Sequence, residues 1–474
     1  MSFTNTITQR LSFYISAVKQ SLNGVEMDYT IGSLRRSVML LAIPMMLEMI
    51  MESVFALVDL YFVGHLPNSS AAIQTVGLTE SVLTIIYSLA IGISMAATAV
   101  VARRIGEKNP EAAAKSGAQA IVMAIGINIV ICIFGLIYAK NLLLMMGASA
   151  EVAENGKPFI SIMIGGSFFI MLLFLINGVF RGAGNAAIAM KSLWVANITN
   201  IILCPLLIRG FGPIPAFGVT GAAIATTAAR ATGVAYQLYH LFGKKGVLKI
   251  IPAYLIPDWK LIKSLGSIAA PGVFQFIIGS CSWIFLAQLV ATTGGDAGSA
   301  GYLIAVRLLM FFLLPAWGLS NAAATLVGQN LGAKQIKRAE QAILLTAKYN
   351  TVYMGFVTLV TYLGAPYFVA FFSNDPQVQE IAKLAVHITA AGYVFYGIGM
   401  VLINSFNGAG DTWTPTWVNL FCYWLIQVPL SYTLSKYLNL GATGVFVSIP
   451  AAEIAVAISG IILYRRGKWK RIKV

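Results

Sequence analysis

The sequence Leu175-Ile-Asn-Gly-Val-Phe-Arg-Gly-Ala-Gly-Asn185 is nearly repeated later in the chain, as Val401-Leu-Ile-Asn-Ser-Phe-Asn-Gly-Ala-Gly-Asp411. Other landmarks recur at spacings that drift only from 227 residues (44 to 271) to 223 residues (218 to 441). They pair Pro44 with Pro271, Gly106 with Gly332, and Gly218-Val-Thr-Gly221 with Gly441-Ala-Thr-Gly444. Because the residues between the landmarks are almost all apolar, we interpret the chain as a duplicated membrane protein. In such proteins the substrate site usually lies between the two copies.

The composition excludes an ordinary soluble protein. The chain has 474 residues, of which 58% are hydrophobic and only 10% charged, whereas globular domains average about 25% charged residues. Apolar segments of about 20 residues can cross the hydrocarbon core as helices, and the short alternating segments of a membrane barrel are missing. We therefore expect an all-α integral membrane protein with twelve transmembrane helices in two parallel six-helix repeats. These helices are expected near 38–62, 73–101, 117–139, 158–180, 190–208, 216–241, 264–291, 301–328, 343–368, 384–406, 414–435 and 440–464.

The net charge of +15 comes from basic residues that gather in alternate loops between the expected helices. The regions 103–115, 244–263 and 334–338 and the tail 465–471 hold such clusters, and the opposite loops hold single basic residues. This is the positive-inside distribution of a multi-pass inner-membrane protein with both termini in the cytoplasm. A nucleic-acid surface would not alternate with the helix count, so no nucleic-acid partner is expected. Six helices return the chain to its starting side, which relates the two lobes by an axis along the membrane normal.

The same pattern divides the chain into five parts. We expect a cytoplasmic leader at 1–35, an N-lobe with helices one to six at 36–243, a cytoplasmic linker at 244–263, a C-lobe with helices seven to twelve at 264–466, and a basic cytoplasmic tail at 467–474. Apolar residues of the leader follow helical spacing, which fits an amphipathic helix on the inner membrane surface. A frayed polar leader fits the same residues. No apolar core precedes a cleavage site, so the leader is not a signal peptide.

Three carboxylates lie in the first expected helix, where each ionisable group costs about 2.5–3.5 kcal/mol on insertion scales. At about 100° and 1.5 Å per residue, Glu48, Glu52 and Asp59 share one narrow face over about 16 Å of helix. Such a face is expected to point to a cavity or the bundle interior, with Asp59 nearest the outer water and Glu48 as a further cavity acid. Neighbouring carboxylates in low dielectric favour proton uptake, the chemistry of a proton-coupled carrier. Hydrogen bonding of these acids to neighbouring helices is the structural alternative.

Further charges fall inside other expected helices. Arg230 in the sixth and Glu453 in the twelfth occupy equivalent positions of the repeat, and Arg307 in the eighth lies roughly opposite Glu80 in the second. We expect structural ion pairs or charges that reach the interface, with gating pairs as the functional alternative. Pro44 removes a backbone hydrogen bond near the start of the first helix, which predicts either a static kink or a hinge that moves the carboxylates.

From Leu34 to Trp469 the chain resembles the multidrug and toxic compound extrusion (MATE) transporters. The residues that carry the resemblance are Ile43-Pro44, Ala56-Leu-Val-Asp-Leu-Tyr-Phe-Val-Gly64, Val101-Ala-Arg-Arg-Ile-Gly106, Leu326-Val-Gly-Gln-Asn-Leu-Gly332 and both Gly-Ala-Gly turns. The resemblance implies a V-shaped pair of six-helix lobes that exports amphipathic, often cationic compounds in exchange for Na⁺ or H⁺.

The resemblance also implies a cation-coupling site in the N-lobe. Asp59 falls on the family's first-helix aspartate, which is tied to cation coupling. Asn200 matches the Asn of an Asn-Xaa3-Asp-Pro pattern found in the fifth helix of archaeal and many bacterial relatives, but Cys204 stands in place of the Asp. Glu52 would then supply the missing carboxylate.

The C-lobe departs from one branch of the family. Gln275 stands where the norfloxacin-resistance branch has a Glu, and uncharged residues surround Tyr396 where that branch has an Asp. The chain is therefore closer to the DNA-damage-inducible branch, in which a lone N-lobe aspartate is linked to proton coupling. We expect H⁺ as the coupling ion, with Na⁺ at Asp59 and Asn200 as the alternative.

Together these features predict a secondary antiporter that exports small amphipathic or cationic compounds by alternating access, with coupling through the carboxylates of helix one. A lipid-linked oligosaccharide flippase of the same superfamily is the alternative, although its cavity would be basic and the buried charges of the first lobe are mostly acidic. No cluster of His, Cys and Asp indicates an enzyme or a metal site, and no cofactor is expected. The expected partners are the transported compounds and the lipid bilayer, and the expected state is a monomer.

Overall fold

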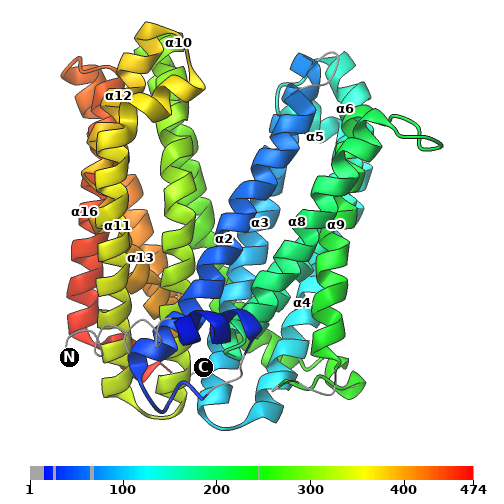
Figure 1. Ribbon diagram of the computed structural model, residues 1–474, viewed down its shortest axis with the longest axis vertical. Helices are drawn as coiled ribbons and strands as arrows, with labels where there is room; N and C mark the ends of the chain where they lie inside the picture. Colours follow the sequence, from blue (N-terminus) through cyan, green and yellow to red (C-terminus); the bar gives the residue numbers. More distant parts are fainter. Residues whose placement is uncertain (1–14, 25–27, 65–68, 244–245, 247, 473–474) are drawn as a thin grey trace, which may run out of the picture. The chain divides into compact units, whose positions relative to one another are not determined.

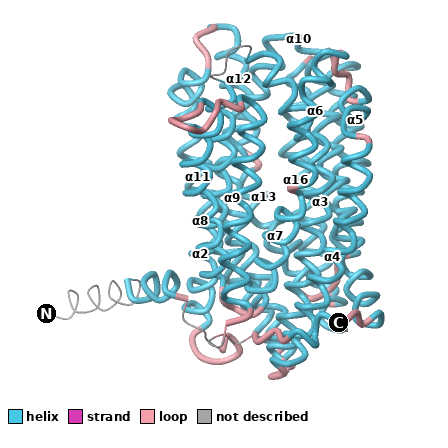
Figure 2. The backbone as a smooth tube through the Cα atoms, turned by 90° about the vertical axis from the view of Figure 1, so that its right-hand side faces the viewer, coloured by secondary structure: helices cyan, strands magenta, loops and turns pink. Residues whose placement is uncertain are grey.

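The computed structural model describes residues 15–24, 28–64, 69–243, 246 and 248–472, and only the backbone of 56–61, 63–64 and 69–73 (Figure 1). Helices make up almost all of this described part, and loops connect them (Figure 2). Its only β pairing is an isolated bridge between Phe211 and Ile214. The chain is therefore all-α, as its long apolar segments predict. Hydrocarbon offers no hydrogen-bond partners to the backbone, and a helix forms these bonds within itself.

The first half of the chain contains a short helix at 15–23 and eight named helices. These are α2 (Leu34–Gly64), α3 (Ser69–Gly106), α4 (Pro110–Ile137), α5 (Ala139–Met145), α6 (Ala150–Gly165), α7 (Ser167–Gly182), α8 (Ala186–Arg209) and α9 (Gly218–Leu241). The helix expected at 158–180 is divided between α6 and α7 at Gly166, which ends α6. The short α5 was not predicted.

The second half begins with the 3₁₀ turn η1 (Pro252–Leu255) and the long helix α10 (Trp259–Gly332). It continues with α11 (Ile336–Phe372), α12 (Pro376–Ala390), α13 (Tyr393–Gly408), α14 (Trp413–Asn419), η2 (Leu420–Gln427), α15 (Val428–Tyr432), η3 (Thr433–Tyr437), α16 (Ala442–Arg466) and η4 (Lys468–Arg471). Both η2 and η3 are π-helical, so the helix expected at 414–435 is wound more widely than an α-helix over part of its length.

Gly295 divides α10 into two helices. Its φ of +62° and ψ of −159° are not helical, and this left-handed backbone is open to glycine because it lacks a Cβ. At 1.5 Å per residue the 74 residues of α10 would measure about 110 Å, whereas the hydrocarbon core is about 30 Å thick. Two membrane crossings are therefore needed, which agrees with the two helices expected at 264–291 and 301–328. The loop expected between them is largely helical.

Eight helices of the described part are long and apolar enough to cross a membrane, or nine if α12 and α13, which bend by 51° at their junction, form one span. This number is below the twelve expected spans for two reasons. The long helix α10 contains two expected spans but is counted once, and α9 and the segment 413–437 are not among the helices that are long and apolar enough. The Ala, Gly and Thr residues of α9 make it less apolar than its neighbours. All twelve expected segments are helical along most of their length.

The internal repeat is visible in the backbone. The turn glycines Gly184 and Gly410 have φ values of +89° and +87°, and the helix-ending lysines Lys108 and Lys334 have +60° and +58°. The packing repeats as well. A Cβ added at Gly182 would lie 2.8 Å from the carbonyl oxygen of Thr98, and one at Gly408 would clash with the carbonyl oxygen of Ala324, the equivalent residue. Both copies therefore use a glycine to bring two helices into backbone contact.

The chain packs as two compact units whose boundaries fall inside α2 and α10. The C-terminal unit comprises Met1–Val18, Asp28–Met46 and Phe274–Val474, and the N-terminal unit comprises Lys19–Met27 and Leu47–Val273. In the N-terminal unit α8 packs on α9 and α3 on α7; in the C-terminal unit α11 packs on α13 and α13 on α16. The lobe boundaries at 36–243 and 264–466 stay a prediction about the repeat.

A segment near each end of the described chain makes specific contacts in the C-terminal unit. The Arg338 guanidinium donates to the backbone carbonyls of Tyr29, Ile31 and Gly32. Trp469 is only 1% exposed and packs in a core cluster with residues of α10, α11 and α13. The segments 28–33 and 468–471 are therefore held against the helices.

Gly408→Ala tests the close contact between α13 and α10. The new methyl group would push the helices apart, and we expect the free energy of unfolding to fall by about 1–3 kcal/mol. Gly355→Ala in α11 is the matched control, because a Cβ there has no neighbour within 4 Å; it should be neutral or stabilising by up to about 1 kcal/mol. Denaturant unfolding of the detergent-purified variants measures both. Equal stability of the two variants would contradict the packing role of Gly408.

Asp258→Asn tests the contact between α4 and the segment before α10. The Lys115 ammonium donates to Asp258 at 2.8 Å, and together with the backbone amide of Leu261 it holds the pKa of Asp258 below its ordinary value of 3.8. A lowered folded-state pKa means that the ionised carboxylate stabilises the fold above pH 3.8, and that this stabilisation is lost as pH falls below it. We expect a lower melting midpoint than wild type at pH 7, with the difference shrinking under strongly acidic conditions. A difference that does not change with pH would contradict the ion pair.

Candidate functional site

Glu48 lies buried in the N-terminal unit, with 2% of its surface exposed. It projects from α2, where one carboxylate oxygen, Oε1, accepts a hydrogen bond of 2.9 Å from Asn177 Nδ2 of α7. Arg181 Nη1, one turn further along α7, lies 3.7 Å from the same oxygen. The other oxygen, Oε2, has no hydrogen-bond partner among the described residues. Two residues of α7 therefore contact Glu48, and both contacts are made to the same carboxylate oxygen, Oε1.

A hydrogen-bond network fixes the orientation of Asn177. Its carbonyl oxygen Oδ1 accepts from Ser192 Oγ of α8 at 3.1 Å and from Gln237 Nε2 of α9 at 2.5 Å. Gln237 Nε2 also donates to the backbone carbonyl of Leu173. Because both neighbours donate to the amide oxygen, the amide nitrogen of Asn177 must face Glu48. Three helices thus determine the environment of one carboxylate.

Glu52 is paired with Arg230. The two side chains come from α2 and α9, and Arg230 Nη2 lies 3.6 Å from Glu52 Oε1. Arg230 is 3% exposed; its Nη2 donates to the hydroxyl of Tyr87 at 3.0 Å, and its guanidinium carbon lies 4.7 Å from the centre of the Phe55 ring. The Glu52 side chain is 23% exposed. Glu52 is therefore the more accessible of the two described carboxylates. Its contact of 3.6 Å is longer than the 2.9 Å hydrogen bond that Glu48 accepts from Asn177.

The described first-helix acids each have an arginine partner, although we expected the buried charges of this lobe to be mostly acidic. Arg181 was not singled out from the sequence, and Arg230 was compared with its repeat equivalent Glu453 rather than with Glu52. The two glutamates are four residues apart on one face of α2, as expected. The third acid, Asp59, lies in α2, but its side chain is outside the described residues.

Asn200 is buried in α8 of the N-terminal unit and is 1% exposed. Its Nδ2 donates to Thr226 Oγ1 of α9 at 3.4 Å, and its Oδ1 has no hydrogen-bond partner among the described residues. Cys204 lies one turn further along α8 and is fully buried. A buried amide oxygen with no donor can accept from a proton carrier or coordinate a cation.

The remaining predicted charges make none of the contacts described above for Glu48 and Glu52 among the described residues. Glu80 of α3 and Arg307 of α10 are both exposed, each in its own unit. Glu453 of α16 is 3% exposed and accepts a hydrogen bond of 3.1 Å from the hydroxyl of Tyr423. Pro44 lies inside α2, two residues before the boundary between the units.

Apart from Arg181, the residues around Glu48 that sequence reasoning missed are uncharged. Asn177, Ser192 and Gln237 are buried in apolar helices, but a search limited to ionisable groups passes over them. A signal was present, because Asn177 and Arg181 are one turn apart in the repeated stretch from Leu175 to Asn185. A scan for any hydrogen-bonding side chain inside the expected spans would have found them.

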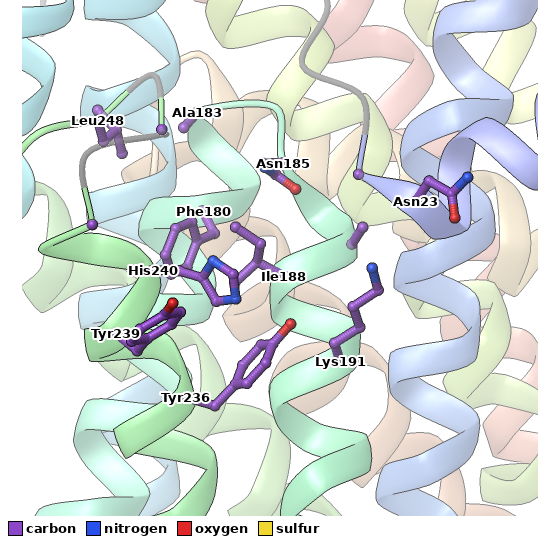
Figure 3. Close-up of a pocket in the computed structure, with 14 residues that line it drawn as sticks. Asn23, Phe180, Ala183, Asn185, Ile188, Lys191, Tyr236, Tyr239, His240 and Leu248 are labelled. Atoms are coloured by element: carbon purple, nitrogen blue, oxygen red, sulfur yellow. The ribbon is translucent and has the colours of Figure 1, made fainter.

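One cavity of the N-terminal unit, with a volume of about 650 Å³, is lined in part by basic and aromatic side chains (Figure 3). The ends of α7, α8 and α9 and the helix at 15–23 surround it, and its lining includes Lys191, Tyr236 and His240. It starts at Phe180, about one turn of α7 from Asn177. None of the described residues that line it is acidic, so these residues offer no opposite charge to a cationic compound.

Arg181→Met tests the pairing of Glu48. Removing one partner of a buried ion pair leaves an uncompensated charge, so we expect a loss of about 3–5 kcal/mol in the free energy of unfolding. The double variant Glu48→Gln with Arg181→Met leaves no charge at the site and should recover most of that loss. Denaturant unfolding of both variants in detergent measures the difference. A single variant as stable as wild type would show that the pair contributes nothing.

Proteins of known name resemble this chain over most of its length. A Thermotoga maritima protein named probable multidrug resistance protein NorM is 25% identical over 441 residues, which cover 93% of this chain and 94% of that protein. The FAD transporter of Shewanella oneidensis is 26% identical over 413 residues, covering 87% and 90%. The multidrug export protein MepA of Staphylococcus aureus is 21% identical over 428 residues, covering 90% and 93%.

Solved structures show the same fold. The outward-facing conformation of a multidrug resistance MATE family transporter matches with a TM-score of 0.87 and 26% identity, covering 93% of this chain and 97% of that one. A MOP superfamily transporter from Pyrococcus furiosus also gives 0.87 at 26% identity, covering 94% and 98%. Two stretches of the sequence, residues 44–206 and 271–433, each match the MatE family, one in each copy of the repeat. The chain belongs to the MatE family.

Proposed function

We propose that the chain is a secondary antiporter that exports amphipathic or cationic compounds, including drugs, in exchange for H⁺. The observation that carries the proposal is the placement of Glu48 and Glu52 on one face of α2 inside the N-terminal unit, in a chain whose relatives include proteins named for multidrug export. Buried acids are costly in a membrane protein and usually mark an ion or substrate pathway. The protein would lie in the inner membrane, with both termini in the cytoplasm.

The two described glutamates support different roles. Glu48 is held by Asn177 and Arg181 and is 2% exposed, which suits a structural acid. Glu52 is 23% exposed in its side chain and has one contact of 3.6 Å to Arg230, which suits an acid that changes partners during transport. Asp59 would be the main proton acceptor, with Glu52 and Asn200 as further members of the site.

The alternative coupling ion is Na⁺. Asn200 Oδ1 has no hydrogen-bond partner among the described residues, and the hydroxyl oxygen of Thr226 lies 3.4 Å from the amide nitrogen. Amide and hydroxyl oxygens together with a carboxylate are hard ligands of the kind that alkali and alkaline-earth cations bind. H⁺ remains our first choice, because Cys204 replaces the second aspartate of the family pattern and sulfur is a poor ligand for Na⁺.

Pro44 supports a hinge in helix one. The residues of α2 up to Met46 belong to the C-terminal unit and those of α2 from Leu47 on to the N-terminal unit. The helix therefore changes unit two residues after a proline, which lacks a backbone donor. We propose that protonation of the acids that follow this point reorients α2 and releases the compound outward. Each inward positive charge gains about 2.3 kcal/mol per 100 mV of membrane potential.

A flippase for lipid-linked oligosaccharides is less well supported. A pyrophosphate headgroup needs a cluster of cations, whereas Arg181 and Arg230 each lie beside a glutamate. Among the described residues that line the cavity beside Lys191 and His240, these two are the basic ones, which is too few for a pyrophosphate site.

Transport in liposomes tests the proposal. Purified protein is reconstituted with a fluorescent cationic dye, and either a pH gradient or a Na⁺ gradient is imposed. We expect dye movement driven by the pH gradient alone, lost to the level of protein-free liposomes in Asp59→Asn and reduced in Glu52→Gln. Glu151→Gln, which removes an exposed acid of α6, should behave as wild type. Full coupled export by Asp59→Asn would disprove the assignment, movement that requires Na⁺ would establish the alternative ion, and no movement under either gradient would remove the antiporter proposal.

A further inference from the structure

Three charged side chains of the described part are buried: Glu48, Arg230 and Glu453. The first two each have a group of opposite charge within 4 Å. Glu453 differs, because the described contact of its carboxylate is the Tyr423 hydroxyl, at 3.1 Å from Oε1, and no described Lys, Arg or His pairs with it. Within the described part of the chain, Glu453 is therefore a buried acid of the C-terminal unit without a counter-ion.

The position of Glu453 makes an unpaired negative charge unfavourable. Glu453 lies about 16 Å from the start of α16 and about 20 Å from its end at 1.5 Å per residue, so it is near the middle of an apolar span. An isolated carboxylate in such surroundings either acquires a partner or becomes neutral by binding a proton. Tyr423 can accept a hydrogen bond from the protonated acid or donate one to the carboxylate, so it suits both states.

The groups around Glu453 are compatible with gain and loss of a proton by its carboxyl group. Tyr423 belongs to the π-helical segment η2, and π-helical turns often occur at functional sites. Tyr396 of α13 and Cys422 of η2 are the other titratable groups described as interacting electrostatically with Glu453, and neither supplies a positive charge. The site therefore combines a carboxyl group, two phenols and a thiol contributed by three neighbouring helical segments.

The internal repeat explains why the partner is missing. Glu453 is equivalent to Arg230, which neutralises Glu52 in the N-terminal unit. At the spacing of Pro44 to Pro271, the equivalent of Glu52 is Gly279, which has no side chain. The second copy thus has an acid in place of the arginine and nothing in place of the acid.

We propose that Glu453 is a second proton-binding site of the transporter, located in the C-terminal unit and assisted by Tyr423. The role of Glu453 in transport rests on the proposed antiport function, whereas proton binding by Glu453 does not depend on it. With one acid in each unit taking up a proton, the transporter would move one more H⁺ per exported compound than a carrier that uses helix one alone.

Infrared difference spectroscopy tests proton binding without transport. Spectra of the full-length protein in liposomes at high and low pH show the C=O band of each carboxyl group that gains a proton. We expect one component of this band to disappear in Glu453→Gln and to remain in Glu380→Gln, which removes an exposed acid of α12. In Tyr423→Phe the component should persist at a shifted frequency, because the carboxyl group loses its hydrogen bond. This second variant keeps the test valid if Glu453→Gln fails to fold. A spectrum unchanged by both substitutions would overturn the proposal.

The transport arm measures the number of protons moved per dye molecule. We expect Glu453→Gln to move one H⁺ fewer than wild type, and Glu380→Gln to match wild type. Coupled export that is lost in Asp59→Asn but has the wild-type H⁺ ratio in Glu453→Gln would overturn the second site and leave the antiporter intact. Wild-type protein that exports nothing under either gradient would overturn the antiporter, while the infrared result would still decide whether Glu453 binds a proton.

Discussion

Inside hydrocarbon no water is available to polar groups, so each buried donor and acceptor must find its partner within the protein. The arrangement around Glu48 depends on this constraint. The Asn177 carbonyl accepts from Ser192 and Gln237, and its nitrogen is thereby turned toward the carboxylate. One amide thus connects α2, α7, α8 and α9. The charge of Glu48 is tolerated because α7, α8 and α9 together hold a donor in place and because Arg181 supplies the opposite charge.

The two copies of the repeat share their backbone but not their electrostatics. Glycine brings equivalent helices together at Gly182 and Gly408, and the turns that follow have nearly the same φ values. The charged positions, in contrast, have diverged: Arg230 in the first copy corresponds to Glu453 in the second. Backbone contacts that fill space leave little freedom for change, whereas a buried charge can be exchanged once its partner changes too. The duplicated scaffold therefore supports two units with different chemistry.

The fold class could be predicted from the sequence because the length of each apolar segment, and the glycines and prolines at its ends, indicate where a helix can cross the membrane. The all-α fold and the family are confirmed. The division at Gly166 and the helical continuation around Gly295 were missed, since both depend on how neighbouring helices pack. The ionisable residues of the site could be named, but not their partners. Arg230 faces Glu52 because of the way the faces of α2 and α9 meet, which no spacing within one helix reveals.

The π-helical segment at 420–427 has a consequence for comparing members of this family. A π turn accommodates an additional residue within a continuous helix, and each added residue rotates the following side chains by about 100° relative to an α-helix. A relative that lacks the extra residue would present different side chains at the same alignment column beyond this point. An alignment without a gap inside this helix would then compare residues whose side chains point in directions about 100° apart. Homologous positions after Gln427 are better matched by the contacts that they make with α16 than by counting along the chain.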